Sequence, residues 1–73
     1  MEKTIYTQSY SRLVGQLKKA RNQAKLNQKD VAKKLNRTQS YISKIESGQL
    51  RVDIIQLKEI AQIYRKHLDF FIK

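Results

Sequence analysis

Apolar residues recur at helical spacing through most of the chain, with polar residues between them. The first periodic stretch begins at Thr7 or Ser9 and runs to Leu26, which predicts a helix followed by a short connector. Its inward face consists of Leu13, Val14, Leu17, Ala20 and Ala24. Residues 1–8 lack this periodicity, so we expect a flexible N-terminal arm there and one folded domain over residues 9–73.

Two shorter helices joined by a tight turn are predicted between Asn27 and Gly48. Asn27 has the side chain of a helix N-cap, and Asp30 is spaced to complete a capping box with it. Asn36 tolerates the left-handed backbone conformation, so it can end the first of these helices and turn the chain. The apolar stripe of that helix consists of Val31, Ala32 and Leu35.

The second of these helices is capped by Thr38, ends at Gly48, and turns Ile42 and Ile45 inward. Glu46, its one acid, is spaced nearer to the apolar side. The opposite face carries amide, hydroxyl and ammonium groups from Gln39, Ser40, Ser43, Lys44 and Ser47. Such groups read base edges and contact phosphates, so this face is a candidate nucleic-acid surface.

A fourth helix is predicted after the loop of residues 49–52. Asp53 is spaced as its N-cap, with Gln56 at the second position of a capping box. Its predicted core stripe consists of Ile54, Leu57, Ile60, Ala61 and Tyr64. A last short helix spans roughly residues 67–72, so the chain is expected to be all-α, with five helices and no strand.

Composition places the chain among small, cysteine-free domains. With 73 residues and no Pro-bearing linker or repeat, it has room for one core. The absence of Cys excludes disulfides and thiolate metal sites. No apolar run reaches membrane-spanning length, and the first ten residues lack the apolar core of a signal peptide, so we expect a cytoplasmic protein.

The net charge of +10 is concentrated in the middle of the chain. Residues 11–51 contain eleven Lys or Arg against two acids, which accounts for +9 of that charge. A lysine-rich surface can serve solubility alone, but this distribution is also typical of proteins that bind a polyanion. The two-helix stretch, rather than the charge, indicates which polyanion.

That stretch resembles the helix-turn-helix of Cro/C1-type (XRE-like) transcriptional regulators. The matching positions are Gln28, Ala32, Leu35, the run Gln39–Glu46 and Gly48, and the resemblance extends over residues 9–71. It implies a compact five-helix, lambda-repressor-like DNA-binding domain with residues 39–47 as the recognition helix in the major groove. It also implies a regulator, in the repressor role, that binds a pseudo-palindromic operator in double-stranded DNA as a homodimer at the nucleoid.

We expect base contacts from Gln39, Ser40, Ser43 and Lys44. Gln is suited to adenine and Lys to guanine, and a solvated side chain is the alternative for Gln39. We expect phosphate contacts from Gln28, Arg37, Thr38, Tyr41, Ser47, Gln49 and Arg51. For Tyr41, packing against the domain is a strong alternative, and for Gln28 the resemblance implies a further hydrogen bond to Gln39.

Two further roles concern the domain itself. The resemblance implies an ion pair between Arg21 and Glu46, for which a free, phosphate-facing Arg21 is the alternative. Apolar residues beyond the needs of a small core are candidates for the dimer interface, unless they complete the monomer core. These residues are Ile55, Ile63, Leu68, Phe70 and Phe71.

The sequence departs from the family pattern around two helix ends. Asn36 occupies the turn position where Gly is usual, and Arg37 follows at a site that is often apolar. Arg65 and Lys66 replace the usual Gly and apolar residue after the fourth helix, which leaves room for a longer helix there. His67 stands where a capping residue is common.

No pattern in the chain indicates catalysis. The acids are scattered over caps and helix surfaces, His67 is the single His, and two Gly do not make a phosphate-binding loop. We therefore expect no enzyme activity, cofactor, metal site, small-molecule ligand or membrane contact. Two alternatives stay open: an antitoxin-like module that acts through a partner protein, and a basic helical protein that binds RNA or anionic membrane.

Overall fold

The computed structural model describes residues 8–72, which form five helices and no strand and so confirm the predicted all-α fold. The helices are α1 (Gln8–Gln23), α2 (Gln28–Leu35), α3 (Gln39–Glu46), α4 (Ile54–Tyr64) and α5 (Asp69–Ile72). Gln8, which we had placed in the arm, is the first residue of α1, and the rest of the predicted arm lies outside the described residues. None of the described helices is long and apolar enough to cross a membrane.

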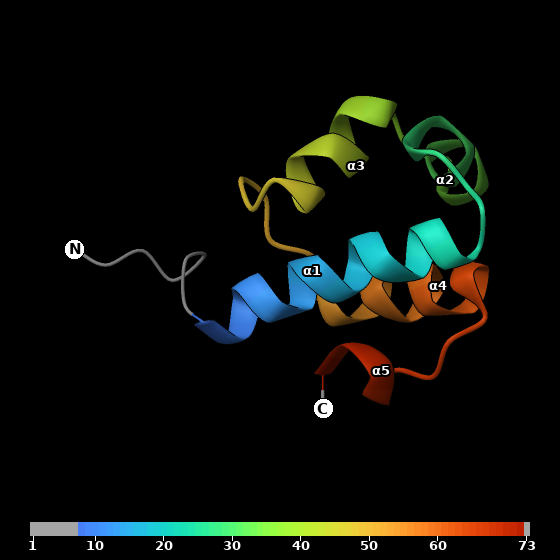
Figure 1. The fold of residues 1–73 in the computed structure, drawn as a ribbon. Helices are drawn as coiled ribbons and strands as arrows, with labels where there is room; N and C mark the ends of the chain where they lie inside the picture. The colour runs from blue at the N-terminus through green and yellow to red at the C-terminus, as the bar shows by residue number, and fades with distance from the viewer. Residues whose placement is uncertain (1–7, 73) are drawn as a thin grey trace.

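Figure 1 shows α1 and α4 alongside each other, with α2 and α3 on one side of them and α5 on the other. The inward faces of these helices meet in one core, whose most buried large side chains are Leu17, Val31 and Ile45. Full burial of one such side chain contributes roughly 1.5–3 kcal/mol. Because these three residues come from α1, α2 and α3, the same core holds the two short helices against the long one.

The helices begin at the predicted caps. The Asn27 side chain accepts a hydrogen bond from the Asp30 backbone N–H at 2.8 Å, and the Asp30 carboxylate accepts one from the Asn27 N–H at 3.2 Å. Thr38 caps α3 and Asp53 caps α4. The capping box predicted at α4 is incomplete, because the Gln56 side chain turns away from Asp53 and bonds elsewhere.

Three helices end in a left-handed residue that is not Gly. These residues are Lys25 (φ 60°) after α1, Asn36 (φ 60°) after α2 and Arg65 (φ 58°) after α4, while Gly48 (φ 84°) follows α3. Arg65 and the next residue donate their backbone N–H groups to carbonyls of the last turn of α4. This closure stops α4 at Tyr64, so Arg65 and Lys66 do not lengthen the fourth helix.

Burial differs from prediction at several apolar positions near the ends of α4 and α5. Ile54, predicted in the core, is 51% exposed, because it is the first residue of α4 and the buried side of that helix begins at Gln56 and Leu57. Phe71, predicted at a dimer interface, is 4% exposed and completes the monomer core. Of the other interface candidates, Ile55 is exposed, whereas Ile63, Leu68 and Phe70 are half-buried against the core. The last helix is also shorter than predicted, since it begins at Asp69.

Candidate nucleic-acid interface

The polar face of α3 is open to solvent. Ile42 and Ile45 are buried in the core, which turns the opposite side of the helix outward. Figure 1 shows α3 at the edge of the domain farthest from α5. The side chains on its outward face are all exposed: Gln39, Ser40, Ser43, Lys44 and the C-cap Ser47. They present donors and acceptors without an acid among them, as a surface that contacts DNA requires.

A buried carboxylate fixes the C-terminal end of α3. Glu46 is 6% exposed and accepts two hydrogen bonds from Arg21, from Nε at 2.8 Å and from Nη2 at 3.1 Å. Arg21 also donates to the carbonyl oxygen of Leu26 at 3.0 Å. The hydrogen bond to Glu46 raises the pKa of Arg21 above its ordinary value. The structure thus contains the ion pair that the resemblance implies, and it ties α3 to the end of α1.

Gln28 joins this ion pair. Its side-chain nitrogen donates to Glu46 Oε1 at 3.1 Å, so the carboxylate receives donors from both α1 and α2. The expected hydrogen bond from Gln28 to Gln39 is replaced by this one, because the buried carboxylate is a stronger acceptor within reach. One of the two amide hydrogens of Gln28 is thereby used inside the protein.

A second polar network holds α3 against α4. The Tyr41 hydroxyl donates to Gln56 Oε1 at 3.1 Å, and Gln56 Nε2 donates to Glu59 Oε1 at 2.6 Å. Gln56 is 6% exposed, and burial raises the pKa of Tyr41. We expected Tyr41 at a phosphate, with packing against the domain as the alternative. In the structure its hydroxyl bonds within the domain.

The loop after α3 is held by a residue that sequence analysis missed. Tyr10, on α1, is 6% exposed, and its hydroxyl donates to the Leu50 carbonyl at 3.1 Å and accepts from the Val52 N–H at 3.1 Å. Its spacing to Val14 and Leu17 continues the inward stripe of α1 by one turn, and that signal could have identified it. The partners of the hydroxyl are 40 and 42 positions away, which no local pattern indicates.

Two arginines lie on tyrosine rings at opposite ends of α3. Arg37 precedes the helix, and its Cζ lies 4.6 Å from the centroid of the Tyr41 ring. Arg51 follows the helix, and its Cζ lies 4.9 Å from the centroid of the Tyr10 ring. Both distances are within the range of a cation–π interaction. Both arginines are exposed, so their charges are available to a ligand that lies along α3.

Residues 17–71 match a helix-turn-helix family model, which is three quarters of the chain and includes all of α2, α3 and α4. The chain belongs to the Cro/C1-type helix-turn-helix family. This family consists of DNA-binding regulators and not of enzymes, so a DNA-binding regulatory function is assigned to this member. Comparisons with curated proteins and with solved structures gave no significant match.

In this helix-turn-helix protein, two of the hydroxyls expected at phosphates already have intramolecular partners. Thr38 Oγ1 accepts the Tyr41 N–H at 3.2 Å, and Ser47 Oγ donates to the Lys44 carbonyl at 3.1 Å. Both side chains are exposed. Thr38 keeps its hydroxyl hydrogen for another acceptor, whereas Ser47 keeps only acceptor sites. Gln49 is exposed in the loop beyond them.

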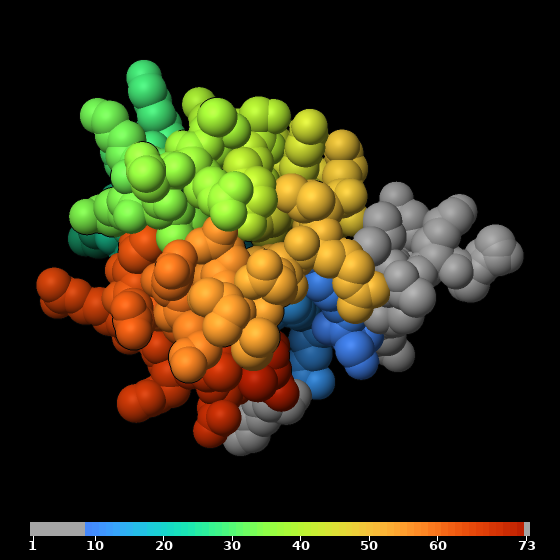
Figure 2. Space-filling model, turned by 180° about the vertical axis from the view of Figure 1, so that it is seen from behind, coloured from blue at the N-terminus to red at the C-terminus, as the bar shows by residue number. Residues whose placement is uncertain are grey.

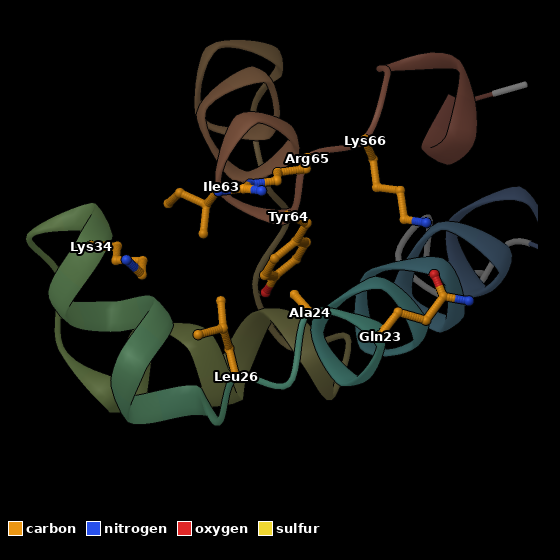
Figure 3. A pocket seen from close by; sticks show the side chains of 8 residues that line it. All are labelled: Gln23, Ala24, Leu26, Lys34, Ile63, Tyr64, Arg65 and Lys66. Carbon is orange, nitrogen blue, oxygen red and sulfur yellow. The ribbon is translucent and has the colours of Figure 1, made fainter.

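A hollow of about 430 Å³ lies at the C-terminal ends of α1, α2 and α4 (Figure 3). Leu26, Ile63 and Tyr64 form its apolar part, and the cationic Lys34 and Arg65 lie at its rim. Burial raises the pKa of Tyr64 well above its ordinary value, and the charge of Glu46 adds to this shift. None of the expected base or phosphate contacts lines the hollow, so it is separate from the outward face of α3.

Proposed function

We propose that this helix-turn-helix protein binds a specific sequence in double-stranded DNA and represses transcription from it. In this proposal α3 enters the major groove and α2 lies across the backbone. The observation that carries the proposal is the outward face of α3, where exposed amide, hydroxyl and ammonium groups gather while the apolar side of the same helix is buried. The net charge of +10 supports binding to the duplex as a whole.

Base recognition would come from the side chains of α3 itself. Gln39, in the first turn, is suited to bidentate pairing with adenine N6 and N7. Lys44 is long enough to donate to guanine O6 or N7, and Ser40 and Ser43 are short enough to let the helix approach the base edges.

Phosphate contacts would fix the position of α3 along the groove. Arg37 and Arg51 are charged and exposed at its two ends, and Gln49 lies beside Arg51 in the loop. Gln28 has one amide hydrogen left for a phosphate after its bond to Glu46. The remaining candidates are Thr38, Tyr41 and Ser47. Thr38 Oγ1 only accepts within the domain, so its hydroxyl hydrogen can be donated to a phosphate. Tyr41 and Ser47 donate their hydroxyl hydrogens within the domain and would have to give up those bonds to donate to a phosphate.

A homodimer would bring two copies of α3 to a pseudo-palindromic operator. One module reads only a few base pairs, and two half-sites about one helical turn apart multiply its specificity. Ile54 and Ile55, at the start of α4, are 51% and 63% exposed, which is unusual for two adjacent apolar residues of a monomer. We place the dimer contact around Ile55, with the half-buried Ile63, Leu68 and Phe70 as further candidates. Figure 2 shows α4, in orange, on the face of the domain opposite to that seen in Figure 1.

Selection from random duplexes tests the proposal directly. The protein is mixed with a library of random double-stranded DNA, and the bound pool is sequenced after several rounds in excess non-specific competitor. We expect an enriched palindrome, since only a sequence reader keeps its preference in competitor. A pool without an enriched motif would contradict sequence-specific binding, and an enriched single half-site would contradict the dimer.

The exposed Ile54 and Ile55 also favour a second candidate, in which a partner protein covers them and controls the domain. This candidate predicts a co-purifying protein of different sequence that abolishes binding to the selected operator. Analysis of the purified protein by mass spectrometry, before and after reconstitution with operator DNA, distinguishes it from the homodimer.

A further inference from the structure

We infer that Tyr10 and Tyr41 are positioning residues, whose rings hold Arg51 and Arg37 in place to clamp the DNA backbone at the two ends of α3. The inference rests on the proposed function, since it concerns how the same surface binds DNA. It assigns to the buried Tyr10 and the half-buried Tyr41 a part in DNA binding that acts through the arginines on their rings.

The first clamp is the Arg37–Tyr41 pair. Arg37 lies just before α3, and its guanidinium carbon is 4.6 Å from the centre of a ring in the first turn of that helix. The ring cannot turn freely, because its hydroxyl donates to Gln56 and Gln56 is in turn bonded to Glu59. The contacts therefore link an exposed arginine, through the Tyr41 ring, to the buried Gln56 of α4.

The second clamp is the Arg51–Tyr10 pair, which is built in the same way from other elements. Arg51 lies in the loop after α3, with its guanidinium carbon 4.9 Å from the centre of the Tyr10 ring. Here the hydroxyl bonds the loop itself, through the Leu50 carbonyl and the Val52 N–H on either side of Arg51. Tyr10 thus fixes both the backbone that carries the arginine and the plane on which its guanidinium rests.

The function of such a pair follows from side-chain entropy. A free arginine on the surface samples many rotamers and must give them up when it binds a phosphate. An arginine already stacked on a fixed ring has lost part of that freedom in the unbound protein, and its planar fork still presents N–H groups to a phosphate. The two clamps lie before and after α3, so together they hold the helix at a defined depth in the groove.

Double-mutant cycles on DNA binding test the inference. Arg51→Ala, Tyr10→Leu and the double variant form one cycle, and Arg37→Ala, Tyr41→Leu and their double variant form the other. In the wild-type background we expect each arginine change to weaken binding to a duplex about tenfold. With the tyrosine ring already removed, the same change should weaken binding only about threefold, because a cation–π contact of this kind contributes a factor of roughly three.

Two controls separate positioning from stability and from charge. Arg65→Asn removes one positive charge at the hollow, away from the outward face of α3, and Asn tolerates the left-handed backbone of this position. It should therefore change the affinity for DNA less than threefold. Tyr10→Phe and Tyr41→Phe keep the rings and remove only the hydroxyls, so they serve if a Leu variant fails to fold. Each Phe variant should fall between wild type and the corresponding arginine variant in affinity.

The dependence of affinity on salt gives a readout that a purely structural role would not change. Loss of one phosphate contact reduces the slope of log affinity against log salt by about one. We expect the Tyr→Leu variants to lower this slope partway towards the value of the corresponding Arg→Ala variants. If the effects are additive in both cycles and the slopes are unchanged, the clamp is overturned but DNA binding stands. If the wild-type protein binds no duplex, the proposed function and the clamp are overturned together.

Discussion

Arg21 and Glu46 form an ion pair, with Nε 2.8 Å from Oε2, that joins the end of α1 to the end of α3. The side chains of these two residues are 16% and 6% exposed, so the Glu46 carboxylate is buried and the Arg21 guanidinium is half-buried. Gln28 on α2 also donates to Glu46, so this one carboxylate of α3 is bonded to both α1 and α2.

Removal of one charge from this pair should destabilise the domain strongly. We expect Glu46→Ala to lower the free energy of unfolding by about 3 kcal/mol, because it leaves the half-buried Arg21 without its carboxylate partner. Urea denaturation followed by circular dichroism measures the change. The double variant Arg21→Met, Glu46→Leu is the control, and it should recover most of the loss; equal losses in the single and double variants would show that the pair itself is not the cause.

Stability should decline at alkaline pH through the buried tyrosines. Burial raises the pKa of Tyr64 and of Tyr41 in the folded protein above about 10, the value for the unfolded chain. The unfolded state therefore loses these protons first, so the stabilisation is fully present below pH ~10 and is lost as the pH rises through the folded pKa values. The decline should approach about 1.4 kcal/mol per pH unit from Tyr64, whose shift is large, and Tyr41 should add a smaller amount.

Unfolding by urea at several pH values between 8 and 11 measures this decline. Tyr64→Phe removes one of the two hydroxyls and should make the decline shallower than in the wild type. An identical pH dependence in that variant would assign the loss to other groups.

Glycine should stabilise the protein where a helix ends in a strained residue. Arg65 has φ 58°, a conformation that costs most residues roughly 1–2 kcal/mol, and glycine avoids this cost at the expense of some unfolded-state entropy. Arg65→Gly should therefore raise the free energy of unfolding by about 0.5 kcal/mol. Lys58→Gly, in the exposed interior of α4, is the matched control and should lower it by about 1 kcal/mol. A loss in both variants would show that the left-handed end of α4 is not strained.

The proposed division between base and phosphate contacts predicts two different kinds of loss. Gln39→Ala should weaken binding to the selected operator by roughly 1–3 kcal/mol and blunt base preference at one position. Arg51→Ala should weaken binding to all duplexes about equally. Titration of each variant against the operator and against single-base variants of it measures both effects, and an unchanged base preference in Gln39→Ala would contradict the recognition role of α3.

The proposed dimer contact predicts a loss of operator binding without a loss of fold. Ile55→Lys places a charge on a side chain that is 63% exposed, so the monomer should remain folded while the dimer dissociates. Sedimentation measures the oligomeric state, and Gln62→Lys adds the same charge at another exposed position of α4 as a control. A dimer that survives Ile55→Lys would move the interface away from this residue.

Sequence alone determined the elements of this protein and the side of α3 that faces outward. The caps at Asn27, Thr38 and Asp53 and the apolar stripes are signals that act over three or four residues, so they can be read along the chain. The turn at Asn36 could be predicted in the same way, because this one residue adopts the left-handed conformation that ends α2. The family resemblance rests on these positions, which is why the fold and the DNA-binding class could be predicted together.

Only the tertiary structure decided what the ends of the helices contact. Phe71 could cover the core or a partner, and the docking of α5 on α1 placed it in the core. Gln56 had the spacing of a capping residue, but the Tyr41 hydroxyl and Glu59 drew its side chain elsewhere. The bonds between Tyr10 and the loop after α3 join residues about forty positions apart. Such contacts depend on how whole helices pack, and spacing along the chain carries no information about them.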